Sequence, residues 1–400
     1  MIVNVVDAGC GIGKTTSIIN MINEDKSDNK YLYITPFLTE VTRIIKECPS
    51  HKFKEPQEEN GENKMNDIKK LLSKGENVVS THALFKKLDE ELLDIIQIND
   101  YILIMDEVAN VVDTLNISKD DLNTITTEYT TINENGLVEW TAESYEGKFE
   151  EYKKMIQLNS VVAYTGAANR ILALIWLFPI KVFQSFKRIY LLTYMFDGQI
   201  QKYYYDLHNV KYKYLYVKDF HLTSEKQNYN MASMKSKIKI CEVNNLNKIG
   251  NDKYALSRGW FERNNNNIVM KKLKSNTYSF FRNNAKSKVK DNLWTTFKMS
   301  KDYLKGKGYS GGFMPINIRA TNELRHKYAV AYLANRYLNP VIKNFFVSNN
   351  IEVDEDAFAL SELIQFIFRT RIRDNEEIFV YVPSKRMRLL LKKWLKEKDQ

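Results

Sequence analysis

The first half of the chain contains short hydrophobic runs separated by segments with helical periodicity. Runs rich in β-branched and aromatic residues cover 2–6, 31–37, 77–85, 101–108 and 160–168. The first run leads through a glycine-rich turn into a helical pattern in which apolar residues recur at helical spacing. Strands that alternate with helices predict a parallel sheet with helices on both faces.

The second half shows a related pattern. The runs at 189–196 and 212–217 predict the first strands of a second α/β domain, and those at 293–298 and 377–383 predict two more. The apolar periodicity from Tyr328 to Tyr337 predicts a helix between them. The sequence RMRLLLKKWLKEK then predicts a closing amphipathic helix.

These patterns divide the chain into two expected domains, residues 1–175 and 176–400. Residues 219–290 are rich in Lys and Asn and are predicted to be a basic insertion within the second domain. Aromatic residues are interleaved with the basic ones in this segment. They either stack on nucleic-acid bases or form a small core of the insertion's own. These aromatic residues are Trp260, Phe261, Tyr278, Phe280 and Phe281.

The net charge of +10 is concentrated in this region. Residues 231–290 hold 14 Lys and Arg against three acidic residues, and the rest of the chain is nearly neutral. A cationic block of this kind indicates a polyanionic partner such as nucleic acid. The alternative is a solvated, lysine-rich surface.

The cysteines and apolar runs indicate a reduced, cytoplasmic setting. Cys10, Cys48 and Cys241 form no CxxC pair and no metal-binding cluster. The first residues lack the charged region of a signal peptide. The longest apolar run, 171–183, is too short for a membrane span and contains Pro179. We therefore expect no membrane partner.

The glycine-rich turn after the first run carries the clearest chemistry. It reads AGCGIGKT from position 8 to 15, which matches the phosphate-loop pattern GxxxxGK[ST] except at its first residue. Glycines let backbone N–H groups turn towards phosphate oxygens, and the following helix N-terminus favours an anion. The residues predicted to bind the nucleotide are Gly9, Gly11, Gly13, Lys14, Thr15 and Thr16.

A pair of acids follows the strand expected at 101–108. Asp106 and Glu107 come directly after four apolar residues, about 90 positions beyond the phosphate loop. In phosphate-loop enzymes, an acid in this place holds Mg²⁺ and a following glutamate polarises the attacking water. We predict Thr15 and Asp106 as Mg²⁺ ligands and Glu107 as a catalytic residue.

The order of motifs resembles that of superfamily-2 helicases and, more narrowly, DEAD/DEAH-type DNA helicases of bacteriophages and mobile elements. In this comparison AGCGIGKT is similar to motif I, ITPFLTEV to motif Ia, MDEV to motif II and YTG (164–166) to motif III. YLLTYMFDGQ resembles motif IV, INIRATNE motif V and QFIFRTRIRD motif VI. Motif II reads DEVA rather than DEAD or DEAH, and motif VI lacks the usual glycines.

The resemblance implies an α/β protein with two RecA-like, parallel-sheet domains and a phosphate-loop NTPase site for ATP and Mg²⁺. It also implies that motif VI contacts the γ-phosphate. At helical spacing, Gln365, Arg369 and Arg373 lie on one face, and we predict them as catalytic residues. The alternative is a basic surface helix paired with neighbouring acids.

The resemblance further implies nucleic-acid contacts at strand ends, which is where open α/β sheets bind ligands. A Thr-Asn pair at a strand end is also an ordinary helix cap, and a structural hydrogen bond is an equal alternative for His82. The residues predicted to contact nucleic acid are Thr35, Thr81, His82, Arg319, Thr321 and Asn322.

The function that we predict is an ATP-dependent DNA helicase or translocase in phage or mobile-element replication. Its expected partners are single-stranded or forked DNA, with RNA as an alternative, and replication proteins. Two other functions fit the same motifs. One is a DNA-packaging motor, and the other is a nucleotide-dependent loader or switch that binds DNA without unwinding it.

Overall fold

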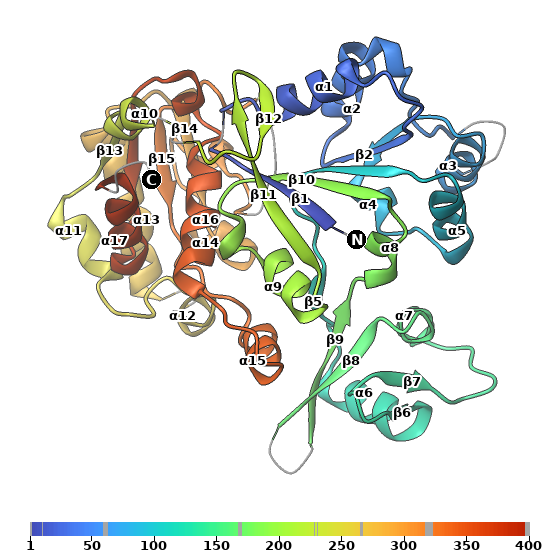
Figure 1. The fold of residues 1–400 in the computed structure, drawn as a ribbon. Helices are drawn as coiled ribbons and strands as arrows, with labels where there is room; N and C mark the ends of the chain where they lie inside the picture. Colours follow the sequence, from blue (N-terminus) through green and yellow to red (C-terminus); the bar gives the residue numbers. More distant parts are fainter. Residues whose placement is uncertain are drawn as a thin grey trace. The chain divides into compact units, whose positions relative to one another are not determined.

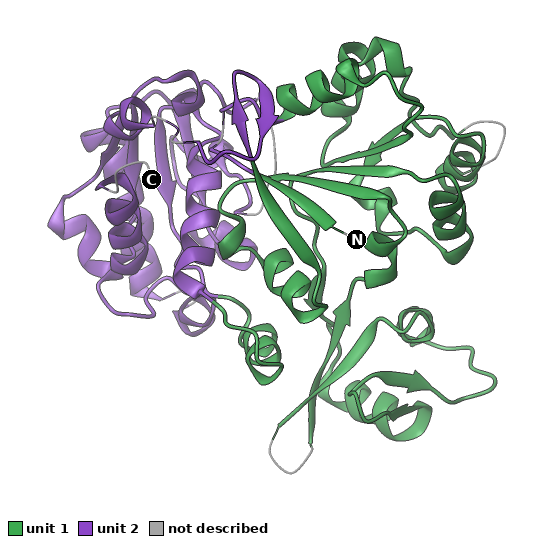
Figure 2. Ribbon diagram, in the orientation of Figure 1, with its two compact units in different colours: residues 1–6, 15–215, 338–353 green, residues 7–14, 216–337, 354–400 purple. Residues whose placement is uncertain are grey.

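The computed structural model describes residues 2–9, 11–58, 63–166, 170–227, 229, 231–264, 267–316 and 323–396. The chain divides into two compact units (Figure 2). Unit 1 comprises Met1–Val6, Thr15–Leu215 and Leu338–Val353, and unit 2 comprises Asp7–Lys14, Tyr216–Tyr337 and Asp354–Gln400. No helix in the described ranges has the length and apolar character that crossing a membrane requires.

The larger sheet has seven strands in the order β12-β11-β1-β10-β4-β2-β3 (Figure 1). β1 pairs in parallel with β11, β4 with both β10 and β2, and β2 with β3. β11 and β12 form an antiparallel hairpin. The strands are β1 (Ile2–Asp7), β2 (Tyr31–Thr35), β3 (Val78–Thr81), β4 (Ile102–Asp106), β10 (Arg188–Thr193), β11 (Lys211–Lys218) and β12 (His221–Thr223).

The central strands of this sheet are buried along their length, as expected for a parallel sheet covered on both faces. All five residues of β2 are buried, and the first four of β4 are buried before its polar end. The helices of this region are α1 (Lys14–Glu24), α2 (Leu38–Glu47), α3 (Lys64–Ser73), α4 (His82–Phe85), α5 (Glu90–Ile98), α8 (Ile180–Gln184), α9 (Ile200–Leu207) and α15 (Pro340–Ser348).

β10 and β11 correct the sequence-based domain assignment. We predicted that both strands open the second domain, but β10 lies between β1 and β4 and β11 pairs with β1. Unit 1 therefore extends to Leu215 rather than ending near residue 175. The hydrophobic pattern identifies a strand, but partners far away in the sequence decide which sheet the strand joins.

A separate module lies between β4 and β10 in the sequence. It contains a three-stranded antiparallel sheet in the order β5-β9-β8 and a β6–β7 hairpin, with a core of its own around Phe149. Its elements are β5 (Val112–Thr114), α6 (Lys119–Thr124), β6 (Thr130–Ile132), β7 (Val138–Trp140), α7 (Glu150–Gln157), β8 (Val161–Thr165) and β9 (Ile171–Leu177). The prediction that 160–168 is a strand of the parallel sheet is wrong, because β8 pairs in antiparallel fashion with β9.

Unit 2 is built on a parallel sheet of four strands in the order β13-β16-β15-β14. The strands are β13 (Ile238–Ile240), β14 (Asn292–Thr295), β15 (Ala329–Tyr332) and β16 (Ile378–Tyr381). The helices of this unit are α10 (Ala232–Ser236), α11 (Asn244–Asn247), α12 (Arg258–Asn264), α13 (Ile268–Ser279), α14 (Lys301–Leu304), α16 (Glu355–Ile367) and α17 (Lys385–Lys396).

Two parallel-sheet regions confirm the predicted α/β class, and β14, β16 and α17 lie where the sequence predicted strands and a closing helix. The helix predicted from Tyr328 to Tyr337 is wrong. β15 occupies this segment, and all four of its residues are buried between β14 and β16. A short, continuously apolar run fits either a buried helix or a buried strand, so periodicity does not separate the two.

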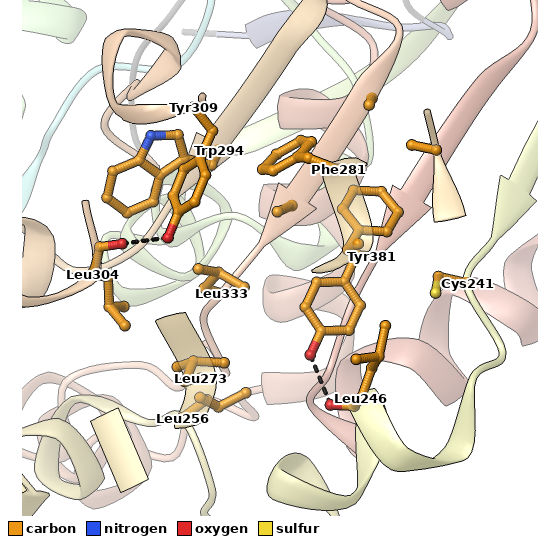
Figure 3. Close-up of a cluster of buried hydrophobic side chains, with 14 of the residues drawn as sticks. Cys241, Leu246, Leu256, Leu273, Phe281, Trp294, Leu304, Tyr309, Leu333 and Tyr381 are labelled. Atoms are coloured by element: carbon orange, nitrogen blue, oxygen red, sulfur yellow. Dashed lines mark hydrogen bonds between the residues drawn. The ribbon is translucent and has the colours of Figure 1, made fainter. Parts of the chain in front are cut away.

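The core of unit 2 is rich in aromatic side chains (Figure 3). Trp294 packs edge-on against Tyr309, with ring centroids 5.4 Å apart, and Tyr309 packs against Phe281 at 5.2 Å. Buried hydroxyl groups keep hydrogen-bond partners there. Tyr309 donates to the Leu304 carbonyl at 2.6 Å, and Tyr381 donates to the Leu246 carbonyl at 2.7 Å. These bonds offset the desolvation of the two hydroxyl groups.

The basic segment 219–290 is an integral part of unit 2 rather than an insertion. It supplies β13 to the four-stranded sheet and α13 to the helices around it. Phe261, Phe280 and Phe281 are buried in the core of the unit. Most of the aromatic residues therefore stabilise the second domain itself, and most of the basic side chains of the segment are exposed.

Gly312 provides a test of the packing in unit 2. A Cβ atom at this position would lie 2.2 Å from the carbonyl oxygen of Asn292, at the start of β14. Since the clash is with backbone, we expect Gly312→Ala to lower the free energy of unfolding by about 2–4 kcal/mol. Gly311→Ala is the matched control because a Cβ atom there meets nothing within 4 Å. Calorimetric unfolding that showed equal stability for both variants would contradict this packing.

Candidate nucleotide-binding site

The predicted phosphate loop lies between β1 and α1 and belongs to unit 2 as residues Asp7–Lys14. Gly11 and Gly13 have φ angles of +87° and +95°, a region in which glycine is favoured because it has no Cβ atom. Lys14 Nζ donates to the carbonyl oxygens of Ala8 at 2.6 Å and Gly9 at 3.2 Å. The ammonium group is therefore held against the loop, which suits it to neutralise a phosphate.

The loop leads directly into the first turn of α1. Thr15 and Thr16 are partly buried there, and Ser17 is completely buried. The first turn of α1 contains no acidic residue, so no carboxylate of its own neutralises the positive end of the helix dipole. Backbone N–H groups, Lys14 and the helix N-terminus together form the type of site that binds phosphate groups.

Backbone and side-chain hydrogen bonds hold the acidic pair at the end of β4. Glu107 has a φ of +68°, and its amide donates to the Leu192 carbonyl of β10 at 2.9 Å. The Nε2 atom of His82 lies 2.9 Å from the Asp106 carbonyl oxygen, and Gln201 Oε1 accepts from the Ala109 amide at 2.8 Å. A side chain of this size at positive φ is uncommon, and such conformations concentrate at functional sites.

These contacts bear on His82. The sequence left open whether it contacts nucleic acid or makes a structural hydrogen bond. The structure shows the structural bond, which links the start of α4 to the end of β4. His82 is partly buried, as is Thr81, the N-cap residue of the same helix.

The turn that follows β10 was not among the predicted site features. Thr193 is buried at the end of this strand and donates to Gln199 Oε1 at 3.0 Å, while Gln199 Nε2 donates to the Tyr194 carbonyl at 2.8 Å. β10 lies between the strand before the phosphate loop and the strand before the acidic pair. The signal was an apolar run ending in a polar residue, as in β4, but its resemblance to motif IV placed it in the second domain.

The arginine-rich segment does not continue the helix before it. α16 ends at Ile367, the Thr370 hydroxyl donates to the Ile367 carbonyl at 2.7 Å, and residues Arg371–Asp374 form a 3-10 turn. Gln365 lies in α16, whereas Arg369 lies beyond its end. The predicted helical face that joins Gln365, Arg369 and Arg373 is therefore wrong.

The arginines of this segment lie in different surroundings. Arg369 is only 7% exposed, and Arg373 is partly buried. The carbonyl oxygen of Arg373 lies 4.0 Å from where a Cβ atom of Gly11 would be, so the main chain of this turn approaches the phosphate loop. The structure therefore brings the main chain of Arg373 near Gly11, one of the predicted nucleotide-binding glycines.

Arg371 has the contacts of a structural residue. Its Nε atom donates to the Glu377 carbonyl at 2.6 Å, and its guanidinium group lies 4.3 Å from the centre of the Tyr328 ring. It also forms an ion pair with Glu376 at 3.6 Å. For Arg371, these contacts agree with the alternative prediction, in which the arginines pair with neighbouring acidic residues. They do not bear on Arg369 or Arg373.

The predicted nucleic-acid contacts have different outcomes. Thr35 is completely buried at the end of β2, and its hydroxyl has no hydrogen-bond partner within the described ranges. The prediction that Thr35 contacts nucleic acid is therefore wrong, because no part of its side chain reaches solvent. Arg319, Thr321 and Asn322 lie outside the described residues.

The fold and the loop define an α/β protein with a glycine-rich loop of the phosphate-loop pattern between the first strand and the first helix. The chain belongs to the YonV family. Residues 112–176 match the YonV middle domain, and residues 232–395 match the YonV C-terminal Rossmann-like domain. The first range corresponds to the separate module, and the second runs from α10 into α17 and includes all four strands of the unit 2 sheet.

One relative is the SPbeta prophage-derived uncharacterized protein YonV of Bacillus subtilis (strain 168). It is 43% identical over 411 residues, which cover 98% of each chain. Among solved structures, Xpd4 of S. tokodaii is 11% identical with a TM-score of 0.49, covering 98% of this chain and 94% of that one. The DUF1998 helicase MrfA bound to DNA and AMPPNP is 11% identical with a TM-score of 0.38, covering 100% and 49%.

Proposed function

We propose that this YonV family protein is a nucleic-acid-dependent ATPase of the helicase or translocase type. One observation carries the proposal. A glycine-rich loop ending in Lys14 follows β1, Asp106 ends β4 and is followed by Glu107 at a φ of +68°, and β10 lies between these two strands. Loops at the carboxyl ends of neighbouring strands in an open α/β sheet form its ligand site.

The phosphate loop and Asp106 supply the binding groups. The backbone amides of the loop hold the phosphates, and Lys14 neutralises their charge. Within the described residues, no group of three or more His, Cys, Asp or Glu is arranged to hold a metal on its own. This suits Mg²⁺, which binds through one or two protein oxygens together with the phosphates of the substrate. The Thr15 hydroxyl and the Asp106 carboxylate are the oxygens that we propose would hold Mg²⁺, and the ion would supply positive charge beside the phosphates.

Glu107 is the proposed residue that orients the attacking water. Its backbone amide donates to the Leu192 carbonyl, which holds the main chain from which the side chain extends. We propose that Arg369 and Arg373 stabilise charge on the γ-phosphate and that Gln365 supports them. A guanidinium group is permanently charged and matches phosphate geometry.

The charge of unit 2 supports a nucleic-acid partner. Lys271, Lys272 and Lys274 are exposed on α13, within the segment that carries most of the excess positive charge. Binding through such groups releases counterions from the nucleic-acid backbone. Thr81, His82, Arg319, Thr321 and Asn322 stay as predicted contacts. The prophage-derived relative supports a role in phage or mobile-element DNA metabolism inside the host cell.

The test is steady-state ATP hydrolysis by the full chain, with and without single-stranded DNA. We expect DNA to raise the turnover by about tenfold or more, since allosteric couplings commonly fall in that range. Heparin is the control, because a polyanion without bases should bind the lysine-rich surface without stimulating turnover. Single-stranded RNA in a parallel assay compares the two nucleic acids.

ATP binding without stimulated turnover would overturn the motor and favour the loader or switch. Stimulation by heparin equal to that by DNA would show that the response is to charge alone. If DNA does stimulate turnover, a forked duplex with a labelled strand then separates a helicase from a translocase.

A further inference from the structure

Residues 267–290 of unit 2 carry charge of a single sign. The segment holds seven Lys and Arg and no Asp or Glu, and all seven basic side chains are exposed. None of the seven forms an ion pair with another residue in the described ranges. We call these seven side chains the basic surface, which comprises Lys271, Lys272, Lys274, Arg282, Lys286, Lys288 and Lys290.

Three lysines of the basic surface project from α13, and this helix is firmly held in unit 2. Asn267 caps its start, and the side-chain oxygen of Asn267 accepts from the Met270 amide at 3.3 Å. Met270 and Leu273 are buried in the core of the unit, and the buried Asn276 side chain donates to the Leu246 carbonyl at 3.1 Å. The backbone that carries the three lysines is therefore fixed.

The chain after α13 folds back against the end of the helix. The Ala285 amide donates to the Phe280 carbonyl at 2.8 Å, and the Ser287 amide donates to the Phe281 carbonyl at 3.1 Å. The four basic residues between positions 282 and 290 therefore lie at the end of the helix that carries the three lysines. Like charges gathered in this way are unfavourable unless an anion neutralises them.

The aromatic residues beside the basic surface are used for packing. Phe261, Phe280 and Phe281 are at most 3% exposed. Trp260 and Tyr278 are partly buried and pack against the same core. Proteins that bind single strands combine positive charge with rings on which the bases stack. A segment that exposes its charges and buries its rings suits a ligand that is bound through its phosphates alone.

The burial of α13 also distinguishes nucleic acid from a membrane surface. Helices that bind anionic membranes insert an apolar face into the lipid. Met270 and Leu273, on the apolar side of α13, are already buried in the core of unit 2. The middle module is not a competing site for a polyanion, because residues 112–176 hold ten acidic residues against five basic ones.

We propose that the basic surface binds the phosphate backbone of double-stranded DNA without reading its sequence. This inference rests on the nucleic-acid binding in the proposed function and adds a duplex site to the single strand on which the ATPase acts. A duplex carries one negative charge per about 1.7 Å of its axis, twice the density of one of its strands. It is therefore the nucleic acid that gains most from charges on a fixed helix.

The experiment measures binding of a fluorescently labelled DNA duplex to the full chain, without nucleotide, over a series of salt concentrations. The variant replaces Lys271, Lys272 and Lys274 with alanine. We expect it to bind at least about tenfold more weakly, with a salt dependence that is shallower by about 2–3 in a plot of log affinity against log salt, since each phosphate contact contributes about 0.9. Alanine favours the helix, so thermal stability should stay near that of the wild type.

A second triple variant is the matched control. Lys26, Lys119 and Lys154 are exposed lysines outside the basic surface, and their replacement by alanine removes the same charge. This variant should bind the duplex with the affinity and salt dependence of the wild type. Two duplexes of unrelated sequence should also bind equally well, because phosphate contacts carry no sequence information.

The outcomes separate this inference from the proposed function. A wild type that binds the duplex but hydrolyses no ATP would contradict the proposed ATPase and leave the duplex site standing. Equal affinity and salt dependence in the two triple variants would overturn the duplex site alone. Tighter binding of a single strand of the same length would overturn it as well. So would binding to phosphatidylserine vesicles that only the first triple variant loses while it keeps its affinity for the duplex.

Discussion

Replacing Lys14 with alanine is expected to abolish ATP hydrolysis and to weaken ATP binding by about 100-fold. Lys14 Nζ contacts the carbonyl oxygens of Ala8 and Gly9, so it lies over the loop that we propose for the phosphates. Charge-assisted hydrogen bonds contribute about 1.5–3 kcal/mol each, and Lys14 supplies more than one in a phosphate site. The measurements are calorimetric titration with ATP and steady-state turnover.

Lys26→Ala is the matched control for this variant. Lys26 is exposed after the end of α1, so its loss removes the same charge without altering the loop. ATP affinity and turnover should stay near the wild-type values. If Lys14→Ala kept full ATP affinity, the assignment of the phosphate loop would be incorrect.

Replacing Arg369 with alanine is expected to lower the turnover number by about 10³-fold while ATP binding changes little. An arginine that stabilises γ-phosphate charge acts mainly in the transition state, and its removal costs 10³–10⁵ in related phosphoryl-transfer enzymes. Arg369 is nearly buried, so thermal unfolding must be measured beside the turnover to exclude loss of the fold.

Arg371→Ala is the comparison that makes this test decisive. Arg371 contacts Tyr328, Glu376 and the Glu377 carbonyl, so its loss should lower thermal stability and leave the turnover of the folded protein near that of the wild type. The two variants remove the same side chain two residues apart. Equal turnover losses in both would count against Arg369 as the catalytic arginine.

The strand and helix that flank the glycine-rich loop, and the strand that ends at Asp106, could be predicted from the sequence because their signals are local. The glycine pattern, the lysine and the flanking strand and helix all lie within about 20 residues of one another. The end of β4 was likewise marked by four buried residues followed by a carboxylate. Such features depend on residues close together in the sequence. They can therefore be predicted without knowing which distant segments pack against them.

Other features depend on distant partners. β10 and β8 both read as apolar runs, yet β10 joins the parallel sheet beside β4, while β8 pairs with β9 outside it. Nothing within either run distinguishes a parallel from an antiparallel partner. For the same reason, the segment of β15 was predicted to be a helix. Its residues are buried by the strands on both sides, and those strands cannot be identified from the segment itself.

The end of α16 shows a different limitation. The apolar pattern continues through Phe368, and no glycine or proline marks the end of the helix. The helix ends because Thr370 adopts an extended conformation and its hydroxyl donates a hydrogen bond to the Ile367 carbonyl. The Arg371 amide then donates to the Lys327 carbonyl instead of continuing the helix. Those partners lie outside the periodic pattern that predicted one face for the arginines.

The module between β4 and β10 is joined to the rest of unit 1 by two strands that pair with each other. β5 enters the module and β9 leaves it, and Val112 lies opposite Leu177 in their antiparallel ladder. Because this pairing keeps the two chain ends together, the segment beyond it can lengthen, shorten or be exchanged over evolution without disturbing the seven-stranded sheet. Related proteins are therefore expected to differ most in length between residues 115 and 174. A variant in which a short linker replaces these residues should also fold.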